Sequence, residues 1–338
     1  MRRYWTLILP VAFLAIPLFV DSPYILHLFI LLFTSIAMGS AWNLIGGMGG
    51  QYSVGHASYY GVGAYTTLVL MQSHIAPWWA GGVAMLLSAG VAVMIGLICF
   101  RLRGPYFVLA SIAVAEILRI AAQSAKRVTN GAEGILANDV RPLVVFGQQI
   151  TDFSSKKPYF VLALGLATAC VVINAIVLRR RLGYWLLAIR EDQDAANSLG
   201  IPLNVYKTYA LVLSGILTAL AGEFYALYVG FIDPNTVLGI ELSVQIVLIC
   251  IIGGIGTTWG PVLGALLLVP LSEALRANLI SEGLFKLGMD RGSKLGGFLS
   301  ENLAHAHVLI YGILVVIVIL FMPDGLMGFF SRRRRAAS

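Results

Sequence analysis

The sequence predicts an all-α polytopic membrane protein with about ten transmembrane helices, and any count from eight to ten fits the pattern. First, 59% of the 338 residues are hydrophobic and only 12% are charged, whereas a soluble domain carries about 25% charged residues. Second, the mean hydropathy is +0.86. Third, the apolar runs are long enough to cross a bilayer as helices, and they lack the alternation over about ten residues that is typical of a transmembrane barrel.

The predicted spans follow the apolar runs in chain order. The first is interpreted as a retained helix because no small-residue cleavage site follows it, and its prolines are compatible with a membrane helix. Trp78 and Trp79 place the start of the fourth span at a membrane interface, and Arg101 and Arg103 end it. The ten spans are residues 1–20, 24–45, a third ending near 71, 78–100, 105–122, 158–178, 206–231, 240–254, 262–279 and 307–321.

Basic residues orient these helices. Short loops rich in Lys and Arg stay in the cytoplasm, and ten spans bring the tight basic clusters at 2–3, 101–103, 179–181 and 332–335 to one face. We therefore expect both termini to be cytoplasmic, with a basic cytoplasmic tail at 331–338. The polar loop 124–157 is then extracytoplasmic, and residues 1–338 form a single transmembrane domain.

The segment 179–206 is the most charged stretch between two apolar runs, and it is predicted to form a cytoplasmic loop because hydrated backbone cannot lie in lipid. A short helix is expected from Glu191 to Leu199, with Ala195, Ala196 and Leu199 on one face and Gly200 as its stop signal. We interpret it as a docking element for a partner, and the alternative is an ordinary solvated loop. The candidate coupling residues are Arg190, Glu191, Asp192, Asp194, Ala195, Ala196, Leu199 and Gly200.

The glycine-rich stretch 43–65 interrupts the apolar pattern within the membrane region. Irregular backbone at membrane depth survives only where protein buries it or water reaches it, and broken segments of this kind often line transport pathways. The alternative is close helix packing through small residues, and His56 taken alone is interpreted as a hydrogen-bonded structural residue. The candidate pathway or gating residues are Asn43, Gly46, Gly47, Gly49, Gly50, Gln51, Ser53, Gly55, His56 and, from a later span, Glu223.

Few charges lie inside the predicted spans. Glu116 with Arg119 and Glu273 with Arg276 have the i, i+3 spacing that places two residues on one helix face. We expect both to be structural ion pairs. Glu223 has no such neighbour, which makes it the charged residue most suited to a functional role.

Several classes of function are excluded by what the sequence lacks. The cysteines are isolated in apolar runs, so neither a disulfide framework nor a metal site is expected. The net charge of +7 resides in loops and in the tail, as membrane orientation requires, and does not indicate nucleic-acid binding. Nucleotide-binding and hydrolase motifs are missing. We therefore expect no enzyme activity and no cofactor in this chain, and any ATPase must be a separate protein.

Five motifs in order carry a resemblance to a known family. They are the residues 43–65, the run 101–110 leading to 116–119, Thr129–Gly134, the run 188–192 leading to 199–201, and Phe321–Leu326. Together they resemble the permease subunits of branched-chain amino acid ATP-binding-cassette importers, specifically the M-type partner of the permease pair. The match departs at Gly183–Tyr184, where family members often have Gly-Arg.

The resemblance implies a multi-pass protein of the bacterial inner membrane within a larger complex. The implied partners are a second permease subunit forming a heterodimer, two cytoplasmic ATPases that bind the ATP, and an extracytoplasmic substrate-binding protein. It also implies that residues 191–200 are the coupling segment that docks into a groove on the ATPase.

The function expected from the resemblance is alternating-access import of branched-chain or related hydrophobic amino acids, with discrimination mainly in the binding protein. One alternative is an importer of the same class for urea or short-chain amides. Another is a self-contained secondary transporter in which Glu223 or His56 titrates. An intramembrane enzyme would need a nucleophile and a base, for which only Ser53 with His56 faintly qualifies.

Overall fold

The structure is a computed structural model of the whole chain, and it is dominated by helices. It describes residues 22–137, 144–145, 148–149, 156–276 and 325–328, with the single positions 13, 17, 312, 313, 316 and 320. The predicted spans 1–20 and 307–321 therefore lie almost wholly outside the described residues, as does the predicted tail 331–338.

Five helical segments in the described part are long and apolar enough to cross a membrane, which confirms an all-α polytopic membrane protein. They are α3 (Pro23–Trp42) with its continuation η1 (Asn43–Met48), α5 (Pro77–Cys99), α6 (Pro105–Ser124), α8 (Lys157–Arg179) and α11 (Leu203–Val229). A proline stands in the first turn of α3, α5, α6 and α8, where its missing N–H breaks no helical hydrogen bond. The count of ten spans stays a prediction.

Shorter elements complete the described fold. Two shorter apolar helices are α13 (Ile240–Gly253) and α14 (Gly260–Arg276), and the less apolar helix α4 spans His56–Gln72. The small elements are α7 (Lys126–Thr129), η2 (Gly131–Glu133), α9 (Arg181–Glu191), α10 (Gln193–Ser198) and α12 (Pro234–Leu238). Strand β1 (Ile135–Leu136) pairs antiparallel with β4 (Phe231–Ile232), and β2 (Val144–Val145) pairs with β3 (Gln148–Gln149).

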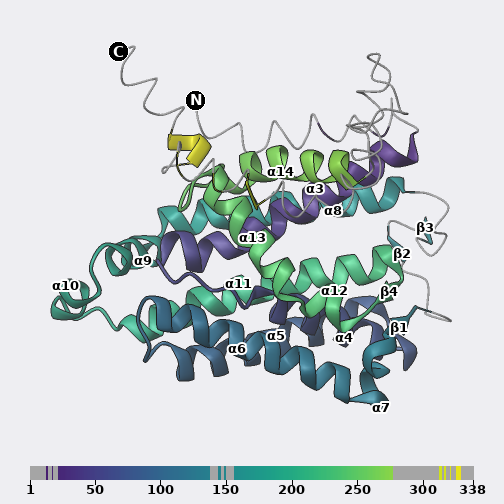
Figure 1. The fold of residues 1–338 in the computed structure, drawn as a ribbon, viewed down its shortest axis with the longest axis horizontal. Coiled ribbons are helices and arrows are strands. Elements are labelled where there is room, and N and C mark those ends of the chain that lie inside the picture. The colour runs from purple at the N-terminus through teal and green to yellow at the C-terminus, as the bar shows by residue number, and fades with distance from the viewer. Residues whose placement is uncertain are drawn as a thin grey trace, which may run out of the picture.

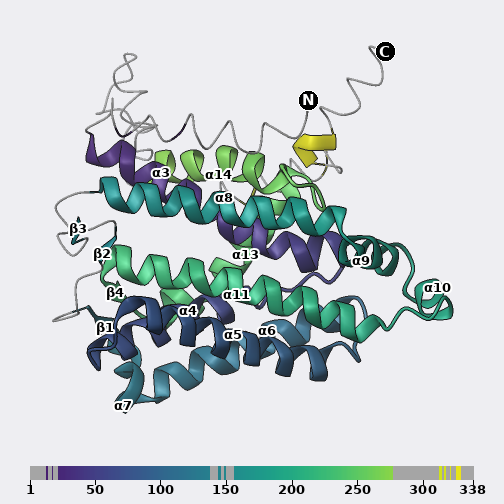
Figure 2. The same ribbon diagram turned by 180° about the vertical axis from the view of Figure 1, so that it is seen from behind.

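The long helices lie roughly side by side, with α3, α8 and α14 on one side of the molecule and α4, α5 and α6 on the other (Figure 1). Helices α11 and α13 lie between them, as the view from behind also shows (Figure 2). The bundle has two distinct ends. We call them the α10 end, where α9 and α10 project, and the strand end, where β1 and β4 lie.

Close packing around α11 explains part of the glycine-rich stretch. A Cβ added to Gly63 of α4 would collide with the carbonyl of Ala219 in α11, and one added to Gly222 of α11 would collide with the carbonyl of Tyr60. Small residues on both helices thus let the two backbones touch. Residues 56–65, which we expected to be irregular, are regular helix, and the irregular backbone is limited to 43–55.

Candidate functional site

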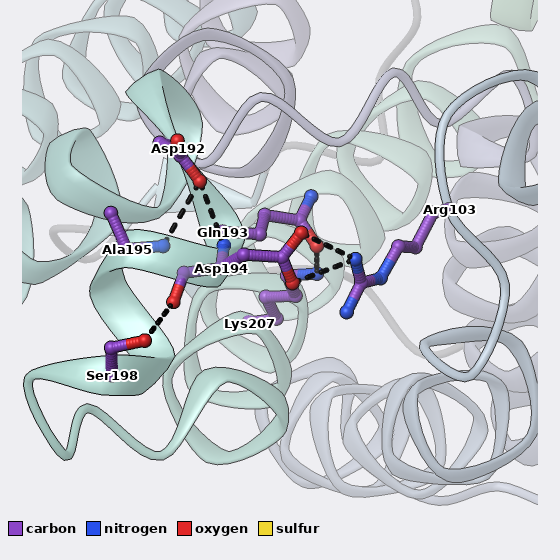
Figure 3. Close-up of polar contacts among 7 residues, drawn as sticks. All are labelled: Arg103, Asp192, Gln193, Asp194, Ala195, Ser198 and Lys207. Atoms are coloured by element: carbon purple, nitrogen blue, oxygen red, sulfur yellow. Dashed lines mark hydrogen bonds and ion pairs between the residues drawn. The ribbon is translucent and has the colours of Figure 1, made fainter.

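The segment 179–206 is mostly helical, and it contains two helices with different roles. Helix α9 ends at Glu191, and Asp192 adopts an extended backbone that separates it from α10. The Asp192 carboxylate accepts hydrogen bonds from the backbone N–H groups of Asp194 at 2.8 Å and Ala195 at 3.0 Å, as Figure 3 shows. It thereby satisfies two donors that the start of a helix leaves free.

The C-terminal end of α10 has the stop that we predicted. Gly200 has a φ of +81°, a conformation that glycine adopts without strain. Its N–H bonds the carbonyl of Asn197 at 2.9 Å, and the N–H of Ile201 bonds that of Ala196 at 3.2 Å. These two bonds form a Schellman motif, and Ile201 packs against Ala196 as the motif requires.

The prediction for this helix is wrong in two respects, which are its first residue and its buried face. The helix starts at Gln193 instead of Glu191, because Asp192 acts as its N-cap. Ala196 is only 2% exposed and packs inward on Ile189 and Ile201, whereas Ala195 and the 82%-exposed Leu199 lie on the outer surface. Ala196 therefore packs α10 against the rest of the protein, and the side of the helix that carries Ala195 and Leu199 faces outward.

Helix α10 is tied to the body of the molecule by two charged side chains. The Asp194 carboxylate pairs with the Arg103 guanidinium, which follows α5, at 2.9 Å. The Lys207 ammonium of α11 donates to the Gln193 side-chain oxygen at 2.8 Å and lies 5.8 Å from the centre of the Phe100 ring. Lys207 is only 1% exposed. As contacts of α10, Arg103 and Lys207 were missed by sequence reasoning, although a lysine near the start of a membrane helix is a signal worth following.

The irregular segment 43–55 begins with the π-helix η1, a form that is common at functional sites. Asn43 is fully buried and lies at the centre of a cluster of polar contacts. Its amide group donates to the carbonyl of Thr257 at 3.0 Å and to the side chain of Asn174 at 3.4 Å. Its side-chain oxygen accepts from the N–H of Gly256 at 2.8 Å. We call these four residues the Asn43 cluster.

Arg190 joins the two predicted regions. Its guanidinium donates to the carbonyl of Gly47 at 3.0 Å, across 143 positions of sequence, and bonds the neighbouring Glu191 at 2.8 Å. A Cβ at Gly50 would collide with the base of the Arg190 side chain, and one at Gly256 would meet the Arg190 guanidinium. Gly50 and Gly256 also have positive φ values of +64° and +75°. The predicted coupling residue Arg190 therefore contacts the predicted pathway segment directly.

The remaining pathway candidates in this segment are held by local contacts. The ring of Trp42 covers Gly46, and Gly49 lies against the carbonyl of Ile45. Gln51 is buried and bonds the carbonyl of Gly49 at 3.3 Å. Gly55 lies against the carbonyl of Ser111 in α6, so a side chain has no room there.

His56 is fully buried and hydrogen-bonded at both ring nitrogens. Nε2 lies 2.8 Å from Ser214 Oγ, and Nδ1 lies 3.1 Å from Ser53 Oγ. Ser214 Oγ donates to the carbonyl of Ala41 at 2.7 Å, and Ser53 Oγ accepts from the N–H of Gly55. A neutral ring with its proton on Nε2 satisfies every one of these bonds, which agrees with the structural interpretation of His56.

Glu223 lies apart from this site, nine residues beyond Ser214 along α11. Its carboxylate packs against Gly81 of α5, where a Cβ would collide with it, and in the described part of the chain no hydrogen bond reaches it. The predicted pair Glu116–Arg119 is formed. The side chain of Arg276 lies outside the described residues, so the second predicted pair stays a prediction.

Comparisons with known proteins identify the family. A family model described as the permease component of branched-chain amino acid transport systems matches residues 24–320. The chain is 28% identical over 263 residues to the high-affinity branched-chain amino acid transport system permease protein LivM of Escherichia coli (strain K12) and equally to that of Salmonella typhimurium, covering 71% of this chain and 61% of each relative. The match therefore spans less than two thirds of those relatives' length.

A shorter match is to the autoinducer 2 import system permease protein LsrC of Yersinia enterocolitica, at 31% identity over 112 residues, or 31% of each chain. No solved structure matches the chain. The family match and the five apolar helices confirm the predicted multi-pass location in the bacterial inner membrane. The chain belongs to the family of permease components of branched-chain amino acid transport systems.

Proposed function

We propose that this chain is a transmembrane permease subunit of an ATP-binding-cassette importer for branched-chain or related hydrophobic amino acids. An extracytoplasmic binding protein delivers the substrate, and two separate cytoplasmic ATPases drive alternating access. This chain performs no hydrolysis and needs no cofactor of its own. A second permease subunit completes the membrane part as a heterodimer. Exposed apolar side chains on α5 and α6, such as Leu97 and Leu109, suit contact with lipid or with that subunit.

In this proposal α10 is the element that docks on the ATPase, and the α10 end is the cytoplasmic end. The observation that carries the proposal is the combination of an outward-facing surface on α10, at Ala195 and Leu199, with fixed contacts on its other side. A docking helix must be exposed to its partner and must also be connected to the helices that it moves.

Two sets of contacts connect α10 to the other helices. One passes through Asp192 and α9 to Arg190, whose guanidinium bonds the backbone of η1 at Gly47. The other passes through Gln193 to Lys207 in the second turn of α11. A displacement of α10 towards the membrane would therefore act on the irregular segment 43–55 and on α11 at once. We infer that this movement opens and closes the pathway at the Asn43 cluster.

Co-purification with the ATPases tests this function. The double substitution Ala195→Arg with Leu199→Arg places two bulky charges on the outer face of α10, and we expect it to abolish ATPase binding while membrane insertion stays intact. The matched control is Val128→Arg with Leu136→Arg, which adds the same charges at exposed positions of the strand end and should leave binding unchanged. A wild type that binds no ATPase and transports substrate alone in vesicles would establish a secondary transporter instead.

A further inference from the structure

A polar cavity of about 570 Å³ lies between α3, α4, α11, α12, α13 and α14. Its inner part is lined by buried side chains of α3, namely Thr34, Ser35 and Met38, and by the buried Tyr60 of α4. The ring of Tyr225 lies beside that of Tyr60, with 5.7 Å between the two centroids. This volume is within the range of about 300–1,000 Å³ that is usual for small-molecule sites.

The opening of the cavity lies towards the strand end. Asn235 and Thr236 of α12 and Glu241 in the first turn of α13 line it, and all three are exposed. On the opposite side, Met38 packs with Trp42, the residue before the Asn43 cluster. The cavity therefore runs from an open end at α12 to a closed end that borders the irregular segment.

The cavity has a distinct charge pattern. Glu241 supplies a carboxylate at the opening, Glu273 is the residue that we expect to pair with Arg276, and the described lining residues include no lysine, arginine or histidine. The Glu241 carboxylate makes no side-chain hydrogen bond within the part of the chain that the structure describes. A carboxylate at the opening of a pocket attracts a cationic group and repels an anion.

Asn235 supplies a fixed donor beside this carboxylate. Its side-chain oxygen accepts from the Arg119 guanidinium at 2.7 Å and from the Gln123 amide at 2.9 Å. Arg119 is itself held by its ion pair with Glu116. Since the oxygen of Asn235 is occupied twice, the amide N–H₂ group is the part of this side chain that remains to donate.

We propose that this cavity is a selective ligand site within the permease chain, and that Glu241 and Asn235 determine which molecules enter it. Glu241 binds an ammonium group, the Asn235 amide donates to an adjacent carboxylate, and the apolar wall at Leu31, Met38 and Leu242 contacts a short hydrocarbon chain. The proposal rests on the proposed role in import. It adds that charge selection occurs in the membrane subunit and does not depend on the binding protein alone.

Direct binding tests the site. The assembled transporter in nanodiscs, without the binding protein, is titrated with radiolabelled leucine. We expect Glu241→Gln to weaken binding about tenfold or more, because a hydrogen bond to a charged group is lost, and Asn235→Ala to weaken it less. The control Glu133→Gln makes the same acid-to-amide change at the strand end but outside the cavity, and it should bind as the wild type does.

Two competitors separate the charges. Isopentylamine has the ammonium and the hydrocarbon chain of leucine without the carboxylate, and 4-methylpentanoate has the carboxylate and the same chain without the ammonium. We expect isopentylamine to displace leucine from the wild type and 4-methylpentanoate to fail. In Glu241→Gln the advantage of the amine should disappear. An anion that competes as well as the amine in the wild type would contradict the proposed selectivity.

A labelling experiment locates the ligand without changing Glu241 or Asn235, so it still tests the site if either of those substitutions perturbs folding. Thr236→Cys places a thiol at the opening, and the native Cys99, Cys170 and Cys250 are buried. Saturating leucine should slow maleimide labelling of this thiol severalfold. Unchanged leucine affinity and uptake in Glu241→Gln, together with unprotected labelling, would overturn the site while leaving ATPase co-purification intact. If the wild-type chain does not co-purify with the ATPases, the importer function is overturned, and leucine binding to the chain can still be measured.

Discussion

The two ends of the bundle use polar groups in opposite ways. At the α10 end, Asn43 and Arg190 donate to or accept from backbone groups of distant segments. At the strand end, Glu241, Asn235 and their neighbours surround an open cavity. Buried polar groups that satisfy one another hold segments together, whereas polar groups facing a cavity remain available to a ligand. The difference predicts that one end controls passage and the other receives the substrate.

The largest effect on transport should come from breaking the link between α9 and the irregular segment. We expect Arg190→Ala to reduce substrate uptake about tenfold or more, since loss of a charged hydrogen bond costs about 1.5–3 kcal/mol. ATPase co-purification should persist, because the outer face of α10 is untouched. Uptake and ATP hydrolysis measured together in proteoliposomes check this. Arg181→Ala removes an exposed arginine from the same helix and serves as control; equal losses in both variants would refute a specific role for Arg190.

A second experiment compares the two ends by stability. Asn43→Ala leaves the N–H of Gly256 and the carbonyl of Thr257 without their partner, and each orphaned group costs about 1–3 kcal/mol. We expect a destabilisation of about 2–6 kcal/mol in thermal unfolding of the purified protein. Gln245→Ala, at the wall of the cavity, should change the melting temperature little. If both variants lower the melting temperature by a similar amount, the Asn43 cluster stabilises the protein no more than a residue of the cavity wall does, and the proposed difference between the two ends is wrong.

The smallest effect concerns the exposed ion pair that positions α10. Arg103 and Asp194 have side chains that are 60% and 75% exposed, and such pairs contribute about 0–1 kcal/mol. A double-mutant cycle with Arg103→Ala and Asp194→Asn should therefore give a coupling energy below about 1 kcal/mol in stability. A value of several kcal/mol would mean that the pair holds α10 more firmly than its exposure indicates.

Local signals in the sequence were sufficient for the C-terminal end of α10 and for the start of irregular backbone near residue 43. Gly200 stops the helix as predicted, because the left-handed conformation is a property of that one residue and its neighbours. The N-cap role of Asp192 was equally local but was missed, since the helix was expected to begin at Glu191, which places Asp192 inside it. The face assignment of Ala196 failed for a different reason. Which side of a short helix is buried depends on what packs against it, here Ile189 and Ile201.

The amino-acid sequence alone determined that this is a polytopic helical membrane protein with a hydrated, capped segment after 179 and a broken segment near 43. These properties follow from hydropathy and from short-range backbone preferences, which neighbouring residues decide. Only the tertiary structure brought Arg190 to Gly47, Asn43 to Gly256, and six helices around one cavity. Such contacts join residues far apart in the chain, and packing, which the local pattern does not encode, decides which of them meet.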